Sequence, residues 1–213
     1  MHTSSPIFKV LLIGGTSHTG KSTLAAALAE QLGWHVRTTD TLARHPGRPW
    51  PTPTWSVPPH VSEHYATLSV RELFDDVLRH YQITIWPMAK ALIESYAQSD
   101  SEAGLVLEGS ALWPEKIVTL KLDNVGALWL TAPRHLIVKR IYEESKYLQK
   151  TPSEKELIDK FAQRALLFND RMLQAVTRLG LAHVDISITD NLPQLTGLCL
   201  QRFAPLKRFD EEL

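Results

Sequence analysis

The segment Gly15-Thr16-Ser17-His18-Thr19-Gly20-Lys21-Ser22 fits the pattern G-x-x-x-x-G-K-[ST] without a mismatch. Glycines let such a loop curl, so that successive backbone N–H groups point inward at phosphate oxygens. In this pattern Lys21 reaches the β- and γ-phosphates, and the hydroxyl of Ser22 is offered to Mg²⁺. We therefore predict that residues 15–23, which include Thr23, bind a nucleotide, and we assign no chemistry to the side chain of His18.

The residues on either side supply the context that a phosphate-binding loop requires, a strand before it and a helix after it. Ile7–Ile13 is short and apolar and leads into two glycines, as a buried strand should. From Gly20 to Leu32 the apolar residues recur at helical spacing, and Gly33 stands where a glycine commonly ends a helix. The alternative, a glycine-rich turn beside a solvated lysine, leaves this context unexplained.

Short apolar segments and helical patterns alternate along the rest of the chain. Four further strands are predicted, over residues 35–39, 104–107, 127–130 and 181–186. Helices are predicted over about 61–97 with a break near Trp86-Pro87, over about 133–147, from the capping box at Thr151–Glu154 to Gly180, and after Asn191. This alternation is typical of a parallel sheet with helices on both faces. The expected fold is a three-layer α/β/α P-loop NTPase with a five-stranded parallel sheet.

The bulk composition narrows the classes of protein. At 213 residues the chain is expected to form one domain, residues 1–213, because single cores stop growing at about 250–300 residues. Lys and Arg together number 23, as do Asp and Glu, so neither a nucleic acid nor a membrane is an expected partner. The single cysteine, Cys199, has no companion for a disulfide or a zinc site, and Ile7–Ile13 is too short for a signal peptide. We expect a cytoplasmic monomer or homodimer.

Two acidic residues follow predicted strands. Asp40 comes after the second strand, and Glu108 comes after the third, which reads Gly-Leu-Val-Leu as in a Walker B strand. Ligands of parallel sheets bind at the carboxyl ends of the strands, where the phosphate loop also lies. Phosphoryl transfer needs a carboxylate for the nucleophile and an anchor for the metal, and Asp40 and Glu108 are our respective candidates. Glu108 alternatively holds the acceptor. The structural alternatives are a helix cap at Asp40 and a surface turn at Glu108.

Residues 41–98 are predicted to form a substrate-binding insertion. Six prolines between residues 41 and 59 exclude a continuous helix or a central strand, so this part is a long loop. Arg44 and Arg48 lie close to Asp40 in sequence and suit an anionic or polyhydroxylated acceptor. Trp50 and Trp55 either stack on a ring of the substrate or anchor the loop.

Residues 140–171 lie in a basic helical region. From Arg134 to Arg178, ten Lys or Arg stand against six Asp or Glu, a local excess in a neutral protein. Arg164 and Arg171 lie seven residues apart and hence on one side of a helix. Such arginines can close over the γ-phosphate and stabilise the charge that develops during its transfer. The alternative for each of them is a solvated helix face.

No guanine-reading N-K-x-D segment is present, which excludes an ordinary GTPase. The phosphate loop, Asp40, Glu108 and the basic helical region together resemble the nucleoside-monophosphate-kinase-like group of P-loop small-molecule kinases, which includes shikimate, gluconate and chloramphenicol kinases. Leu107–Ser110 and Phe168–Arg171 resemble more particularly the 2-phosphoglycerate-kinase-type sequences and the uncharacterised "AAA family ATPase" P-loop sequences. The resemblance spans nearly the whole chain.

The resemblance implies an activity, roles for residues and a helical lid, which we predict over residues 140–171. In the kinases it resembles, an acidic residue in the place of Asp40 contacts the acceptor hydroxyl and takes its proton, and Arg140 stands near the place of the first lid arginine. The chain is then expected to transfer the γ-phosphate of MgATP to a hydroxyl, less readily a phosphate, of a small metabolite. The catalytic residues would be Lys21, Asp40, Arg140 and Arg164. The alternative from another class is a nucleotide-binding regulatory ATPase that presents its proline-rich loop to a protein partner.

Overall fold

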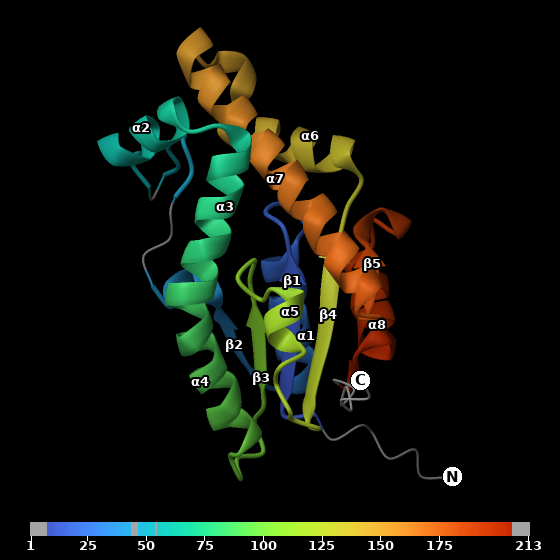
Figure 1. Ribbon diagram of the computed structural model, residues 1–213. Coiled ribbons are helices and arrows are strands. Elements are labelled where there is room, and N and C mark those ends of the chain that lie inside the picture. The colour runs from blue at the N-terminus through green and yellow to red at the C-terminus, as the bar shows by residue number, and fades with distance from the viewer. Residues whose placement is uncertain (1–7, 44–46, 54, 206–213) are drawn as a thin grey trace.

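A parallel β-sheet forms the centre of the molecule in the computed structural model, which describes residues 8–43, 47–53 and 55–205 (Figure 1). Its strands are β1 (Val10–Gly15), β2 (His35–Thr38), β3 (Leu105–Glu108), β4 (Val125–Thr131) and β5 (His183–Asp185). Their spatial order is β2-β3-β1-β4-β5, and all of these pairings are parallel. The predicted five-stranded parallel sheet is confirmed. A two-residue strand, β6 (Ala204–Pro205), pairs antiparallel with β4 and was not predicted.

Helices cover both faces of this sheet, as the alternating pattern predicts. They are α1 (Lys21–Leu32), α2 (Pro59–Thr67), α3 (Val70–His80), α4 (Trp86–Ala97), α5 (Pro114–Ile117), α6 (Arg134–Ser145), α7 (Pro152–Arg178) and α8 (Leu192–Arg202). In Figure 1, α1 lies behind the sheet, whereas α3, α4, α5 and α7 lie in front of it. Within the described part of the chain, no helix is long and apolar enough to cross a membrane.

Alternating side chains of the central strands supply two separate cores, one on each face. Leu11 and Ile13 of β1 pack with α1, α6, α8 and the first half of α7. Val10 and Leu12 pack with α3, α4, α5 and the second half of α7. This period of two is what a pleated strand buried on both faces requires. The three layers place the carboxyl ends of β1, β2 and β3 at one edge, which is where the functional residues gather.

The capping signals predict two helix boundaries correctly. Thr151 caps α7 through a reciprocal capping box with Glu154, and Asn191 caps α8 by accepting a hydrogen bond from the Gln194 N–H. At the C-terminal end of α1, Gly33 takes a left-handed conformation with φ of 67°. Strand β1 runs through Gly15, two residues beyond the predicted end, and Ile7 lies outside the described residues.

The predicted break in the 61–97 helical region is in the wrong place. The chain breaks before Ser69, which opens α3 with a capping box to Glu72. At Trp86-Pro87 it stays helical, because a π-helical turn over Tyr81–Ile85 leads directly into α4. A proline lacks an N–H donor and crowds the carbonyl oxygen four residues earlier in a regular helix, and the π-helical turn directly before α4 accommodates Pro87.

Replacing Gly14 is expected to destabilise the fold through Trp129. A Cβ atom at Gly14 would lie 2.3 Å from Cδ1 of that indole, whose Nε1 donates to the Leu112 carbonyl oxygen (3.0 Å). Gly14→Ala should therefore lower the free energy of unfolding by about 1–3 kcal/mol, as overpacking does. Gly197→Ala in α8, where a Cβ meets nothing within 4 Å, should raise it by about 0.5–1 kcal/mol. Urea denaturation of both variants checks this, and equal stabilities would contradict it.

Candidate active site

The phosphate loop, residues 15–22, joins β1 to α1 through backbone conformations that few residues adopt. Positive φ angles occur at Gly15 (149°), His18 (67°) and Gly20 (81°). A Cβ at Gly15 would lie 2.8 Å from the Leu130 carbonyl oxygen, so the position requires glycine. Gly20 is the N-cap of α1. The first N–H groups of α1 lack partners within the helix and are available to an anion above the loop.

Side-chain hydrogen bonds fix the shape of the loop. Thr19 Oγ1 donates to the Thr16 carbonyl oxygen (2.9 Å), and Thr16 Oγ1 donates to the Ala165 carbonyl oxygen of α7 (3.1 Å). Lys21 is buried, and its Nζ donates to the Thr16 carbonyl oxygen as well (2.8 Å). Burial lowers the pKa of Lys21, and the carboxylates on the neighbouring strands partly offset that shift. The ammonium group is thus held inside the loop.

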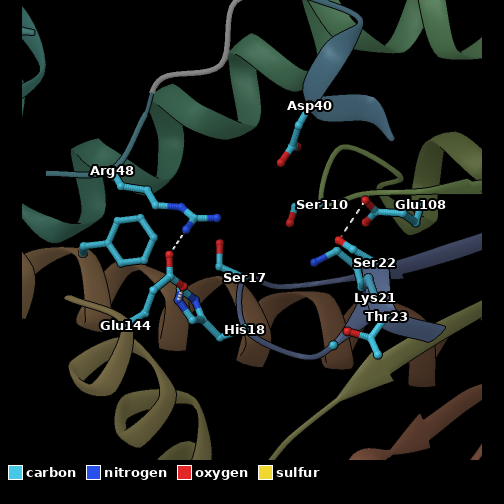
Figure 2. A pocket seen from close by; sticks show the side chains of 12 residues that line it. Ser17, His18, Lys21, Ser22, Thr23, Asp40, Arg48, Glu108, Ser110 and Glu144 are labelled. Carbon is cyan, nitrogen blue, oxygen red and sulfur yellow. Dashed lines mark hydrogen bonds and ion pairs between the residues drawn. The ribbon is translucent and has the colours of Figure 1, made fainter. Parts of the chain in front are cut away.

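Those carboxylates are Asp40 and Glu108, which the ends of β2 and β3 bring to the loop as predicted. Asp40 is exposed and lies in a helical turn, Thr39–Thr41, where its N–H donates to Thr38 Oγ1 (3.3 Å). Glu108 is buried and accepts a hydrogen bond from Ser22 Oγ (3.0 Å; Figure 2). The two residues predicted to bind the metal are therefore in direct contact.

The Ser22–Glu108 pair suits Mg²⁺ better than it suits a metal ion whose ligands all come from the protein. Mg²⁺ prefers oxygen ligands and is usually bound by one or two protein groups together with waters and substrate phosphates. A hydroxyl and a carboxylate in contact match that ligand set. The described residues contain no group of three or more His, Cys, Asp or Glu side chains that could hold a metal ion. A magnesium ion here would depend on the phosphates of a nucleotide.

A cavity of about 240 Å³ lies above the loop, and we call it the phosphate cavity. It is lined by Ser17, His18, Gly20, Lys21, Ser22, Thr23, Asp40, Arg48, Glu108, Ser110, Glu144 and Phe161. Figure 2 shows the side chains of Lys21, Asp40 and Arg48 turned toward the same space. The fold thus gathers residues from the loop, two strand ends, the proline-rich segment and helices α6 and α7.

The predicted lid arginines do not line the cavity, and they occupy different settings. Arg140 of α6 donates from Nη1 to the His18 carbonyl oxygen (2.9 Å) and so touches the loop from the side. Arg164 of α7 is buried, with its guanidinium over the rings of Phe161 (4.5 Å) and Tyr65 (5.9 Å). Arg171 lies about 10 Å further along the axis of α7, is exposed and contacts its own helix. The two arginines thus lie on one helix, as predicted, but differ in burial, and their role at the γ-phosphate stays a prediction.

The tryptophans of the proline-rich segment are anchors. Trp50 is 1% exposed and its ring lies edge-on to Phe161, with ring centroids 4.7 Å apart. Trp55 Nε1 donates to the Arg48 carbonyl oxygen (3.4 Å). These contacts fix the segment against α7 and place Arg48 at the cavity. Arg44, the other arginine predicted to bind substrate, lies outside the described residues.

Three lining residues were not predicted as site residues: Ser110, Phe161 and Glu144. Ser110 lies two positions after Glu108, so the predicted end of that strand could have indicated it as a site residue. Phe161 reads in sequence as one more apolar residue of α7. Glu144 lies in the last turn of α6, where its carboxylate accepts a hydrogen bond from His18 Nε2 (2.7 Å) and pairs with the Arg48 guanidinium. Nothing local in the sequence marks a glutamate of a basic segment as part of the site.

His18 is neutral at physiological pH. Burial, the largest cause, and four nearby cations, Arg48, Lys21, Arg140 and Arg164, together lower its pKa from 6.5 to about 3. These effects outweigh the Glu144 carboxylate, which favours the charged ring. A neutral ring donates through one nitrogen only, so Nε2 carries the proton that Glu144 accepts.

The protein is expected to lose stability as the pH is lowered, because of His18. The unfolded chain takes up a proton at this residue near pH 6.5, whereas the folded chain does so only near pH 3. Acidification therefore favours unfolding, by about 2 kcal/mol between pH 7 and pH 5 for this one group. Urea denaturation at both pH values should show that loss in the wild type beyond the loss in His18→Gly, in which glycine tolerates the positive φ. An equal loss in the two proteins would contradict the assignment.

Two kinases are among the solved structures with a similar architecture. A gluconokinase from Sinorhizobium meliloti 1021 matches with a TM-score of 0.50 and 18% identity, over 92% of this chain and 91% of that one. A shikimate kinase from Aquifex aeolicus vf5 matches with a TM-score of 0.51 and 13% identity, over 91% of this chain and 95% of that one. No protein-family model matches the sequence, and no curated protein is significantly similar to it. The chain has the P-loop small-molecule kinase fold that its sequence predicts.

Proposed function

We propose that the protein is an ATP-dependent kinase that transfers the γ-phosphate of MgATP to a hydroxyl group of a small metabolite. The observation that carries this proposal is the phosphate cavity, in which the loop and Lys21 share one space with Asp40 and the Ser22–Glu108 pair. A phosphate loop alone would suit any nucleotide-binding protein. A carboxylate in the same cavity is what a phosphoryl acceptor requires in addition.

In the proposed reaction the residues of the loop and the strand ends have separate parts. Backbone N–H groups of residues 15–22 and the ammonium of Lys21 bind the β- and γ-phosphates. Ser22 and Glu108 would hold Mg²⁺, which when bound neutralises charge on the phosphate oxygens. The acceptor hydroxyl oxygen bonds to the γ-phosphorus as the bond from that phosphorus to the β–γ bridging oxygen breaks. The proton of the acceptor hydroxyl passes to Asp40, and ADP is the leaving group.

We further propose that residues 41–98 hold the acceptor and that residues 140–171 act as the lid. Three contacts support this division, because Arg140 and Glu144 of α6 both touch His18 of the loop, and Glu144 pairs with Arg48. Closure of the lid over the cavity would exclude water and so suppress idle hydrolysis of ATP.

A screen of hydroxylated metabolites tests the proposed activity. Purified protein is incubated with MgATP and pooled metabolites, ADP release is followed, and phosphorylated products are identified by mass spectrometry. The expected result is slow ATP hydrolysis that accelerates with one chemical class of metabolite and yields its phosphate ester. A protein that is indifferent to every metabolite, but whose affinity for a protein partner changes with nucleotide, would instead be a regulatory ATPase.

A further inference from the structure

Glu144 places a negative charge in the phosphate cavity, where bound nucleotide would bring more. Its side chain is 35% exposed and its carboxylate is held by two partners from different segments. His18 of the loop donates to one oxygen at 2.7 Å, and Arg48 of the proline-rich segment pairs with the other. A carboxylate beside a phosphate loop repels phosphate, so its presence calls for a physical explanation.

The backbone of His18 takes an uncommon conformation, and several contacts hold its side chain. A φ of 67° is uncommon for a residue other than glycine, and such a conformation persists only where surrounding contacts hold it. The imidazole lies edge-on to Phe161, with ring centroids 6.1 Å apart, and 6.3 Å from Trp50. The side chain at this position therefore ties the loop to α6, to α7 and to the proline-rich segment.

Helix α6 holds His18 at two points. Arg140 and Glu144 lie four residues apart and so share a face of the helix. Arg140 contacts the carbonyl oxygen of His18, and Glu144 contacts its ring. The pair between Glu144 and Arg48 then joins the proline-rich segment to the same point. One carboxylate thus connects three segments that surround the cavity.

We infer that Arg48 binds the terminal phosphoryl group of the nucleotide, and that Glu144 occupies the place of this group in the free protein. The inference rests on the proposed function in taking nucleotide phosphates to bind at the loop. Arg48 and Glu144 line the same cavity as Ser17 and Lys21, where a third phosphate would lie. The negative charge of this third phosphate repels the Glu144 carboxylate and displaces it from Arg48. The released guanidinium then turns to the phosphoryl oxygens. ADP lacks this group and leaves the pair closed.

Glu144→Gln tests the inference because glutamine keeps the shape and the hydrogen-bonding oxygen but removes the charge. The matched control is Glu143→Gln, one residue away on α6, whose side chain is 63% exposed and pairs with Lys139 (3.9 Å). Titration calorimetry with MgATP and with MgADP gives the affinities. Glu144→Gln should bind MgATP about tenfold more tightly than the wild type and the control, the change expected from one hydrogen bond to a charged group. Its affinity for MgADP should be unchanged.

A second set of variants separates Arg48 from the rest of the cavity. When Arg48 is also replaced by Gln, Glu144→Gln should raise the affinity for MgATP by a smaller factor than it does with Arg48 present. The reason is that no guanidinium is then available to be released from Glu144. Glu144→Ala serves as a second variant should the glutamine protein fail to fold. A Glu144→Gln protein that binds MgATP no more tightly than Glu143→Gln, or that gains equally for MgADP, would overturn the inference. Failure of the wild type and of every variant to bind MgATP would instead reject the proposed function.

Discussion

Lys21→Met is expected to lower kcat/KM for phosphoryl transfer by about 10²–10³-fold, the loss typical of removing one preorganised group that stabilises developing charge. The buried ammonium of Lys21 is held inside the loop by the Thr16 carbonyl oxygen, so it is already in place when phosphate binds. Methionine has a similar length and volume but no charge. The packing of the loop against α7 through Thr16 and Ala165 should therefore survive the substitution.

The measurement is ADP release at varied MgATP, with circular dichroism to show that the variant is folded. The matched control is Lys139→Met, since Lys139 is 67% exposed on α6 and pairs only with Glu143 among the described residues. This control should keep wild-type activity. A Lys21→Met protein as active as Lys139→Met would mean that the loop does not bind the transferred phosphate.

Asp40→Asn is expected to lower kcat by about 10²–10⁴-fold while leaving the affinity for MgATP unchanged. A positioned general base typically contributes a factor of this size, and asparagine cannot take the proton of the acceptor hydroxyl. The backbone around Asp40 is fixed by its own N–H, which donates to Thr38 Oγ1, so the substitution should not move the turn. Single-turnover kinetics with the acceptor identified by the metabolite screen separate transfer from nucleotide binding.

Glu108→Gln provides the contrast that distinguishes a base from a metal anchor. Glu108 contacts Ser22 Oγ, and its replacement should raise the concentration of Mg²⁺ needed for half-maximal rate. The two roles would be exchanged if Asp40→Asn kept its rate and altered only the magnesium requirement. In that case Glu108 would be the group that takes the proton.

The fold was predictable because its signals are local. The glycine pattern of residues 15–22, the capping box at Thr151 and the short apolar strands each depend on neighbours within a few positions. The error at Trp86-Pro87 has the same origin. Proline is a strong local signal for a break, but a π-helical turn over Tyr81–Ile85 absorbs it, and the packing of α3 and α4 on the sheet decides between the two.

The site was predictable only where a strand end or the loop placed a residue in it. Asp40 and Glu108 lie together because the carboxyl ends of parallel strands meet at one edge. Glu144 contacts His18 across 126 positions of sequence and Arg48 across 96, and no periodicity reports such a contact. Arg164 shows the converse, since charge suggested a mobile cation and the structure buries its guanidinium against the rings of Phe161 and Tyr65.

Nucleotide binding by the purified wild-type protein is the decisive test of the phosphate loop. Titration calorimetry with ATP, ADP and GTP, each in the presence of magnesium, measures whether the amides of residues 15–22 and Lys21 hold nucleotide phosphates. We expect saturable binding of MgATP at a single site on each chain. No measurable affinity for any of the three nucleotides would contradict it and leave only the α/β architecture standing.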